Sequence, residues 1–268
     1  MHWFPEKVEG KLFIMSLVIC LGASLFATQL LVSTEEDNLL EKTKRELESL
    51  SQQQSFELFN EMSERKSQGL EAARKIQEAW STHSDASTLP PFLKLNDQSD
   101  GSKIRVSPNL ISSCYVAEGT QLSSELNVKI ASAEQSFESI APEFLTYFRN
   151  MTLITTDDVC ISSPPSQSAL IPSGFAPSKH PTLVDISKLN KTNAKPFWSP
   201  VRLDPEFQIW LTTLVVPLYN GDTYIGVLTN DYSLNHIFSR FNRLRANEAQ
   251  GKAFIFRGNE ELLIHSSL

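Results

Sequence analysis

The stretch that decides the fold is residues 196–238, PFWSPVRLDPEFQIWLTTLVVPLYNGDTYIGVLTNDYSLNHIF. Its centre is the tripeptide Asn220-Gly221-Asp222, which lies between two runs rich in β-branched and aromatic residues. An Asn-Gly pair in this setting favours a two-residue type I′ hairpin, because both central residues must adopt positive φ. The stretch therefore predicts an antiparallel sheet, preceded by a further strand within PFWSPVRLDP.

The second run of this hairpin ends on the polar pair Asn230-Asp231, and Ser233 follows. A serine at this point can cap a helix, and the next apolar residues recur at helical spacing. Those residues are Leu234, Ile237, Phe238 and Phe241. The pattern places a carboxylate, Asp231, at the end of a strand and beside whatever covers that face of the sheet.

Length and composition allow either one large domain or two small ones. The chain has 268 residues, of which 41% are hydrophobic, and this is enough for a packed core. Its net charge of −7 and the lack of clustered Lys and Arg argue against a nucleic-acid-binding protein. The same charge disfavours binding to anionic membrane surfaces.

Residues 12–32 form an uncharged apolar run of the length that a membrane-spanning helix needs. Lys7 and Lys11 precede the run and three acidic residues follow it at 35–37, so the positive-inside rule places residues 1–11 in the cytoplasm and residues after 33 outside it. A cleaved signal peptide is the alternative, although the run is long for one and no small-x-small cleavage site closes it. The residues before Cys20 do not fit a lipoprotein signal.

Residues 33–82 are rich in Glu, Lys, Gln, Leu and Ala and predict one long stalk helix, capped at Thr34. The alternative is a solvated helix that frays.

The sequence after the stalk predicts loops, a helix and hairpins. Residues 81–109 are predicted to form a loop, and residues 122–149 a helix that is broken before Pro142. The segment MTLITTDDVCISS predicts a hairpin that turns at Asp157-Asp158. Residues 162–192, rich in Pro and Ser, predict an irregular excursion over one face of the sheet, where binding sites often lie. KAFIFRGNEELLIH predicts a last strand-turn-strand unit.

The motifs W-S-P-V-x-L-D-P, V-P-L-Y and G-V-L-x-N-D-x-S-L, within residues 197–238, resemble the extracytoplasmic Cache sensor domain of bacterial receptors. The layout of residues 34–268 is similar to that family as well. The resemblance implies an α+β, PAS-like antiparallel sheet with flanking helices, a homodimer in the inner membrane with its sensor in the periplasm, and an output domain such as a histidine kinase, diguanylate cyclase or chemotaxis domain. It divides the chain into a tail, a transmembrane helix, a stalk, a sensor module and the start of a second, incomplete module, at residues 1–11, 12–32, 33–82, 83–250 and 251–268.

Three residues form the predicted ligand site. Asp231 matches the strand-end aspartate of the family, which in amino-acid-sensing members contacts the ammonium of the ligand; its alternative role is to cap the helix that follows. Arg202, where many relatives carry Tyr, could bind a carboxylate at two points or pair with Asp204. Trp198 shares a face with Arg202 if the strand is continuous and would form an apolar wall, although core packing is the more common role for Trp198 and Trp210. The chain lacks the R-x-W-Y arrangement of amino-acid-binding members.

Two classes of function remain: a receptor input that binds a small carboxylate or zwitterion, and a membrane-tethered module that binds a partner chain in an apolar groove. No P-loop, nucleophile elbow or paired carboxylates indicate an enzyme. The histidines have no metal-site spacing, so we expect no cofactor and no metal. They are His83, His180, His236 and His265, besides His2. Cys114 and Cys160 would lie in an oxidising compartment, where a disulfide between them is an open alternative.

Overall fold

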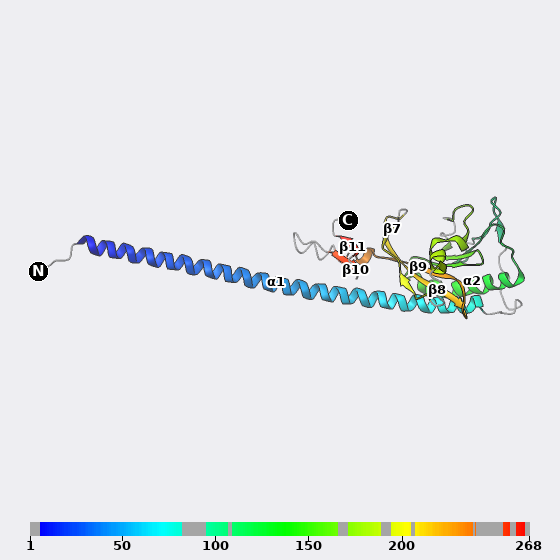
Figure 1. Cartoon of the computed structure of the whole chain (residues 1–268), viewed down its shortest axis with the longest axis horizontal. Helices are drawn as coiled ribbons and strands as arrows, with labels where there is room; N and C mark the ends of the chain where they lie inside the picture. The colour runs from blue at the N-terminus through cyan, green and yellow to red at the C-terminus, as the bar shows by residue number, and fades with distance from the viewer. Residues whose placement is uncertain are drawn as a thin grey trace. The chain divides into compact units, whose positions relative to one another are not determined.

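A computed structural model of the chain describes residues 6–81, 95–106, 109–165, 171–188, 194–204, 207–237, 239, 254–257 and 261–265. The chain divides into two units, residues 1–63 and 64–268. Figure 1 shows the elements in order. They are α1 (Glu6–Ser81), β1 (Asn96–Asp97), β2 (Lys103–Arg105), β3 (Ser113–Val116), α2 (Ser124–Phe144), β4 (Met151–Thr155), β5 (Val159–Ser163), the 3₁₀ helix η3 (Pro177–Lys179), α3 (Pro181–Lys188), β6 (Phe197–Trp198), β7 (Arg202–Asp204), β8 (Ile209–Asn220), β9 (Thr223–Ser233), β10 (Phe254–Arg257) and β11 (Glu261–His265).

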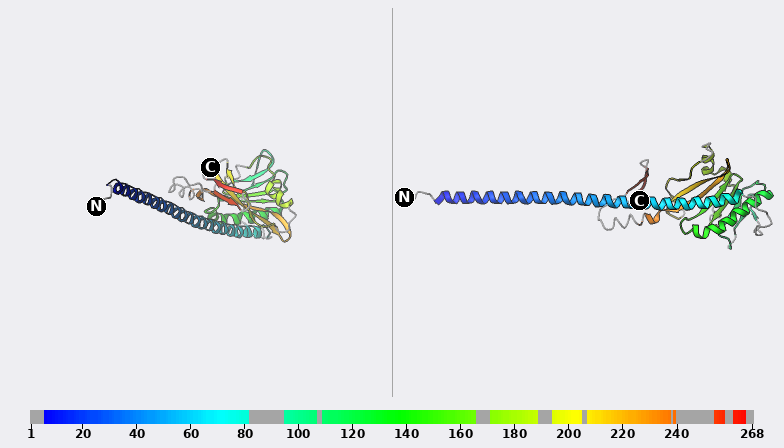
Figure 2. Two further views of the ribbon diagram at one scale, coloured as in Figure 1. Left: turned by 60° about the vertical axis from the view of Figure 1, so that its left-hand side comes forward. Right: turned by 90° about the horizontal axis from the view of Figure 1, so that it is seen from below.

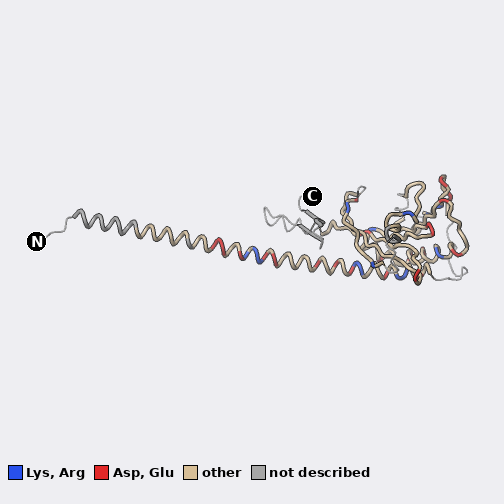
Figure 3. The backbone as a smooth tube through the Cα atoms, viewed as in Figure 1, with Lys and Arg blue, Asp and Glu red and all other residues tan. Residues whose placement is uncertain are grey.

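The first unit consists of helix α1 up to residue 63. The predicted long helix is confirmed, but the predicted cap at Thr34 is wrong, because α1 runs through this residue without a break. The physical reason is that residues 11–68 contain no proline and a single glycine, Gly22, so nothing ends the helix. After the uncharged residues 12–34, charged side chains begin again at Glu35 and continue along the helix (Figure 3). Among the helices of the described ranges, none has a segment both long and apolar enough to cross a membrane.

The second unit is built on one antiparallel sheet, in the order β1-β2-β3-β5-β4-β9-β8-β6, with β7 also pairing with β8. Both predicted hairpins, β4–β5 and β8–β9, are confirmed and form its centre. β8 is buried at eight consecutive positions from Leu211 to Leu218, because both of its faces are covered. The sheet is larger than the sequence predicted. Strands β1 and β2 lie in the predicted loop of residues 81–109, and β3 lies in residues 110–121, for which the sequence predicted no element.

The turn between β8 and β9 differs in type from the prediction. Asn220 still pairs with Thr223, so the central residues are Gly221 and Asp222. Only Gly221 has positive φ, +60°, and this is the pattern of a type II′ turn, which takes glycine at its first central position. A β-bulge between Leu218 and Tyr219 shifts the register by one residue, which explains why the Asn-Gly pair does not hold the two central positions.

Helices α1 and α2 cover one face of the sheet. In α2, the Ser123 hydroxyl accepts a hydrogen bond from the Leu126 N–H at 3.1 Å, and apolar residues at helical spacing point inward. The fully buried Phe137 ring is worth about 1.5–3 kcal/mol relative to exposure. The helix continues through Pro142 and ends at Phe144, so the predicted break before Pro142 is wrong and the helix is shorter than the predicted range of 122–149. Figure 2 shows α2 beside the end of α1.

The last three turns of α1 also pack on this face, with Ile76 and Trp80 buried against it. A Cβ on Gly69 would lie 2.3 Å from the Leu214 side chain, so the glycine permits helix and strand to approach closely. The Gln77 side-chain oxygen accepts a hydrogen bond from the Tyr219 N–H at 3.3 Å, at the β-bulge. The end of α1 is therefore fixed to strand β8.

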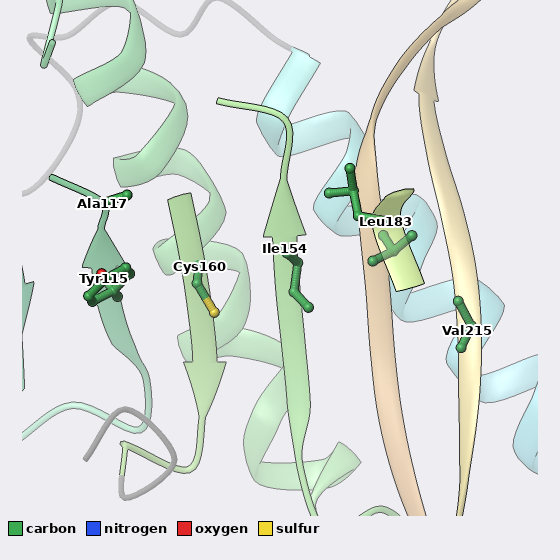
Figure 4. Packing of buried hydrophobic residues seen from close by; sticks show 7 residues of the cluster. Tyr115, Ala117, Ile154, Cys160, Leu183 and Val215 are labelled. Atoms are coloured by element: carbon green, nitrogen blue, oxygen red, sulfur yellow. The ribbon is translucent and has the colours of Figure 1, made fainter. Parts of the chain in front are cut away.

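The opposite face carries an apolar cluster that the excursion covers, as predicted for residues 162–192. Tyr115, Cys160, Ile154 and Val215 point to this side from neighbouring strands, and the two helices lie behind the sheet (Figure 4). Leu183 of α3 packs onto them. The excursion is less irregular than predicted, since it contains η3 and α3; its residues 166–170 and 189–193 lie outside the described residues.

Two carboxylates and one hydroxyl hold the excursion in place. Asp100 accepts hydrogen bonds from the Ser173 hydroxyl at 2.9 Å and the Gly174 N–H at 3.1 Å, while Asp158 accepts one from the Ser178 N–H at 2.9 Å. The Tyr115 hydroxyl donates to the Phe175 carbonyl at 2.8 Å. Hydrogen bonds from the Ser102 hydroxyl and N–H, together with those from Ser173 and Gly174, hold the pKa of Asp100 well below its ordinary value.

The last predicted strand-turn-strand unit is confirmed as β10 and β11, which, among the strands that the structure describes, pair only with each other. The helix expected after Ser233 begins at Asn235, and its predicted apolar residues Phe238 and Phe241 lie outside the described residues. The same holds for His83 and for residues 82–94 of the predicted loop.

Candidate functional site

Asp231 lies near the end of β9, directly opposite Thr213 of β8. The Thr213 hydroxyl donates a hydrogen bond to Oδ1 at 2.5 Å, and the Asn150 amide donates to Oδ2 at 2.9 Å. The Arg202 guanidinium donates to Oδ2 as well, from Nη2 at 3.1 Å. The side chain of Asp231 is 15% exposed, so this carboxylate is largely withdrawn from water and bound by two neutral donors and one cation.

Sequence reasoning missed Asn150, which follows α2 and immediately precedes β4. Besides donating to the carboxylate, its Oδ1 accepts the backbone N–H of Asp231 at 3.0 Å. The N–H of Arg149 donates to the Asp231 carbonyl at 2.8 Å. Asn150 and Asp231 come together because β4 lies beside β9 in the sheet, with Thr152 opposite Thr229. Asn150 and Asp231 are 81 residues apart, and no local pattern signals their contact.

The helix-capping alternative for Asp231 is not what the structure shows. The Asp231 carboxylate points to Asn150, Arg202 and Thr213, while the Asn235 N–H at the start of the helix donates to the Ser233 hydroxyl at 3.4 Å. Arg202 and Asp231, which were predicted to share the ligand site, form an ion pair with each other. Arg202 does not pair with Asp204, whose Oδ1 accepts the Phe207 N–H at 3.1 Å.

Trp198 lies on the opposite face of the sheet, and the prediction that it shares a face with Arg202 is wrong. It pairs with Leu214, whereas the Asp231 partner Thr213 is the neighbouring residue of β8 and points the other way. Its ring packs on Tyr232, with centroids 6.0 Å apart. The reason is that the predicted strand is two strands, β6 and β7, separated at residues 199–201, so alternation does not carry from Trp198 to Arg202. Trp198 therefore lies on the face of the sheet that α1 covers, which agrees with the alternative that this residue packs against the core.

Three threonines extend the polar surface around Asp231. Thr213 and Thr229 share its face, because they lie at alternate positions of paired strands, and Thr152 lies opposite Thr229. The Thr229 hydroxyl donates to the Thr152 carbonyl at 3.3 Å. This face is therefore polar at the Asp231 end and apolar at the end that holds Val215 and Ile154. A partly buried carboxylate beside hydroxyl groups is suited to bind a small cationic group.

The two buried cysteines are free thiols. Cys160 is opposite Tyr115 in the β3–β5 pair, so Cys114 is one position away and points to the other face, which rules out the disulfide left open above. Burial raises the pKa of Cys114 to about 12 and that of Cys160 to about 11, so neither is a reactive nucleophile. Among the described residues, no three His, Cys, Asp or Glu side chains gather as a metal site would require.

The helix-covered face carries an open hollow between α1 and α2. It is lined by small and polar side chains, among them Lys75, Glu78, Ser132 and Gln135. Beneath α2, Arg105 and Glu134 form a buried ion pair. Neither feature lies on the face that carries Asp231.

Comparisons with known proteins give matches only among solved structures. No family model and no curated protein matches the chain. The ligand-binding domain of the Pseudomonas aeruginosa PAO1 amino acid chemoreceptor PctC, solved in complex with GABA, has a TM-score of 0.41 and 16% identity over 50% of this chain and 56% of that one. That of the Pseudomonas fluorescens chemoreceptor CtaA, with L-serine, has a TM-score of 0.37 and 18% identity over 50% and 54%.

The sensory domain of the Campylobacter jejuni chemoreceptor Tlp3, with isoleucine bound, has a TM-score of 0.32 and 16% identity over 55% of this chain and 54% of that one. The chain thus spans about half the length of the solved chains that it matches. All three are ligand-binding or sensory domains of chemoreceptors.

Proposed function

We propose that this chain is the extracytoplasmic sensing part of a membrane-bound signal-transduction receptor, and that its second unit binds a small molecule at Asp231. The observation that carries the proposal is the setting of this carboxylate: it is 15% exposed, fixed by Asn150 and Thr213, and beside the half-exposed cation of Arg202. Opposite charges at one place suit a small zwitterion or a carboxylate. The Cache-like motifs around residues 197–238 support the same function.

The polar character of this site favours a small ligand over a partner chain. An interaction module that holds a partner would present an open apolar groove. The apolar side chains of this face instead pack beneath the excursion, where Leu183 and Phe175 cover them. The long helix α1, whose end is fixed to β8, is placed to receive a displacement of the sheet when a ligand binds.

The membrane anchor is part of the same proposal. Residues 12–32 are uncharged, with Lys7 and Lys11 before them and acidic residues at 35–37 after them, and this charge distribution supports a cytoplasmic N-terminus. We place the PAS-like module at residues 83–250 in the periplasm, the start of a second module at residues 251–268, and the receptor in a homodimer of the inner membrane. A reporter enzyme fused after residue 100 should be active outside the cytoplasm and remain with the membrane fraction; release as a shortened soluble protein would identify a cleaved signal instead.

Ligand binding is tested by a thermal-shift screen of the full chain with organic acids, amines and amino acids. At least one zwitterion or carboxylate should raise the melting temperature, and Asp231→Asn should abolish the rise, because losing one partner of a largely buried charge contact costs about 2–5 kcal/mol of binding. Asp222→Asn is the control, since it removes the same charge from an exposed position of the same hairpin. A ligand that stabilises wild type and Asp231→Asn equally would place the site elsewhere.

A further inference from the structure

We infer that Arg202 is the specificity-determining residue of the Asp231 site. It excludes ligands that carry only an amine, and it admits ligands whose own carboxylate can replace Asp231 as the partner of the Arg202 guanidinium. The inference rests on the proposed function and adds to it a rule of selection. Its basis is that Arg202 Nη2 lies 3.1 Å from Asp231 Oδ2, at the atom that the ammonium of a ligand would approach.

Of the three donors to the Asp231 carboxylate, Arg202 is the one that can move. Thr213 is 9% exposed, and the register of β8 with β9 holds it opposite Asp231. Asn150 is fixed twice, because it also accepts the Asp231 N–H. Arg202 lies on the three-residue strand β7 and its side chain is 49% exposed, so water can solvate the guanidinium as it leaves.

A simple amine has to compete with this guanidinium. If it displaces Arg202 from Asp231, one ion pair replaces another and nothing is gained; if it binds beside Arg202, two positive charges share one carboxylate and repel each other. In both cases the ion pair already present opposes the amine. The site therefore discriminates against ligands whose only charged group is positive.

A zwitterion meets the opposite situation. Its ammonium binds Asp231 while its carboxylate accepts hydrogen bonds from the freed guanidinium, whose planar fork suits two-point contact with a carboxylate. One ion pair is then exchanged for two. A ligand with only a carboxylate is less favoured, because it leaves the largely buried Asp231 without a cation and brings a second negative charge toward it.

The test uses pairs of probes that differ only by a carboxylate: methylamine with glycine, ethylamine with β-alanine, and propylamine with γ-aminobutyrate. Each is titrated into the full chain in mild detergent, with calorimetry as the readout. In the wild type, a zwitterion of suitable charge separation should bind more tightly than its amine partner. In Arg202→Gln, amine binding should strengthen and zwitterion binding weaken, each by roughly twofold to fivefold, the range that a partly exposed ion pair is worth.

The matched control is Arg149→Gln. Arg149 precedes Asn150 and contacts Asp231 only through its backbone N–H, while its guanidinium lies over the Phe207 ring, 4.8 Å from the centroid. This variant removes the same charge from the same neighbourhood without removing a donor to the carboxylate. We expect it to leave the ratio of zwitterion affinity to amine affinity as in the wild type.

The outcomes separate the inference from the function on which it rests. If zwitterion binding is lost in Asp231→Asn but Arg202→Gln leaves the affinity ratio unchanged or raises it, the sensing site stands and the inference about Arg202 is overturned. An equal fall of the ratio in Arg149→Gln would overturn it too, since general charge would then explain the selection. If no probe binds either the wild type or Arg202→Gln, both the proposed function and the inference fail.

Discussion

Replacing Gly226 by alanine should destabilise the sheet that carries the Asp231 site. Gly226 of β9 is opposite Thr155 of β4 and has a φ of +152°. A Cβ built there would lie 2.2 Å from the Ile154 carbonyl oxygen and 2.9 Å from the Thr155 Cα. These are backbone atoms of the adjacent strand, so no side-chain rotation relieves the contact, and β4 and β9 must separate.

The magnitude follows from two effects. A non-glycine residue at this φ costs on the order of 1–3 kcal/mol of backbone strain. Forcing extra volume into a packed region costs typically about 1–3 kcal/mol more. The free energy of unfolding should therefore fall by about 2–6 kcal/mol. Because 1 kcal/mol corresponds to roughly 2–4 °C in a domain of 150–250 residues, the melting temperature should fall by about 4–24 °C.

Thermal unfolding of the full chain, followed by tryptophan fluorescence, measures the effect, with Gly221→Ala as the control. Gly221 also has positive φ, +60°, but a Cβ there meets no atom within 4 Å. Gly221→Ala therefore carries backbone strain but no steric overlap. Its melting temperature should be higher than that of Gly226→Ala, and the difference measures the cost of the overlap. Equal melting temperatures for the two variants would refute the close approach of β4 and β9.

The remaining predictions concern the thiols, the site and the C-terminal hairpin. Cys114 and Cys160 should react with a thiol reagent at pH 8 only on unfolding, because both are buried. Since burial raises the pKa of Cys114 to about 12 and that of Cys160 to about 11, the free energy of unfolding should be largest below the unfolded-state thiol pKa and should fall as pH rises above about 9, as unfolding measured across pH would show. Asn150→Ala should lower the free energy of unfolding by about 1–3 kcal/mol, since it leaves buried partners unpaired, and should weaken ligand binding; unchanged urea midpoint and affinity would contradict this. Deleting residues 250–268 should leave the melting temperature of the remainder nearly unchanged, because β10 and β11 pair only with each other, and a large fall would place the hairpin in the main domain.

The central hairpins were predictable because their signals are local. Two β-rich runs around Asn220-Gly221-Asp222 lie next to one another in sequence, and the turn residues restrict how they pair. The same locality placed Asp231 at a strand end. The turn type was not predictable, because it depends on the β-bulge at Leu218 and Tyr219, which shifts the register and has no clear sequence signal.

The composition of the site was less predictable, because it depends on contacts between distant residues. Arg202 and Asp231 are 29 residues apart and meet only because β7 and β9 both flank β8. Asn150 reaches Asp231 through the pairing of β4 with β9, and the sequence of neither strand indicates that the two are neighbours in the sheet. Trp198 was assigned to the wrong face because the prediction carried strand alternation across Pro200, where the structure has no strand.

The binding of a ligand at Asp231 is tested most directly by a crystal structure of the full chain in complex with the molecule that stabilises it most. We expect a nitrogen of the ligand within hydrogen-bonding distance of Asp231 Oδ2, about 2.7–3.2 Å, with the Arg202 guanidinium moved from that oxygen to a carboxylate of the ligand. Ligand density elsewhere, with Arg202 still 3.1 Å from Asp231, would contradict the central claim.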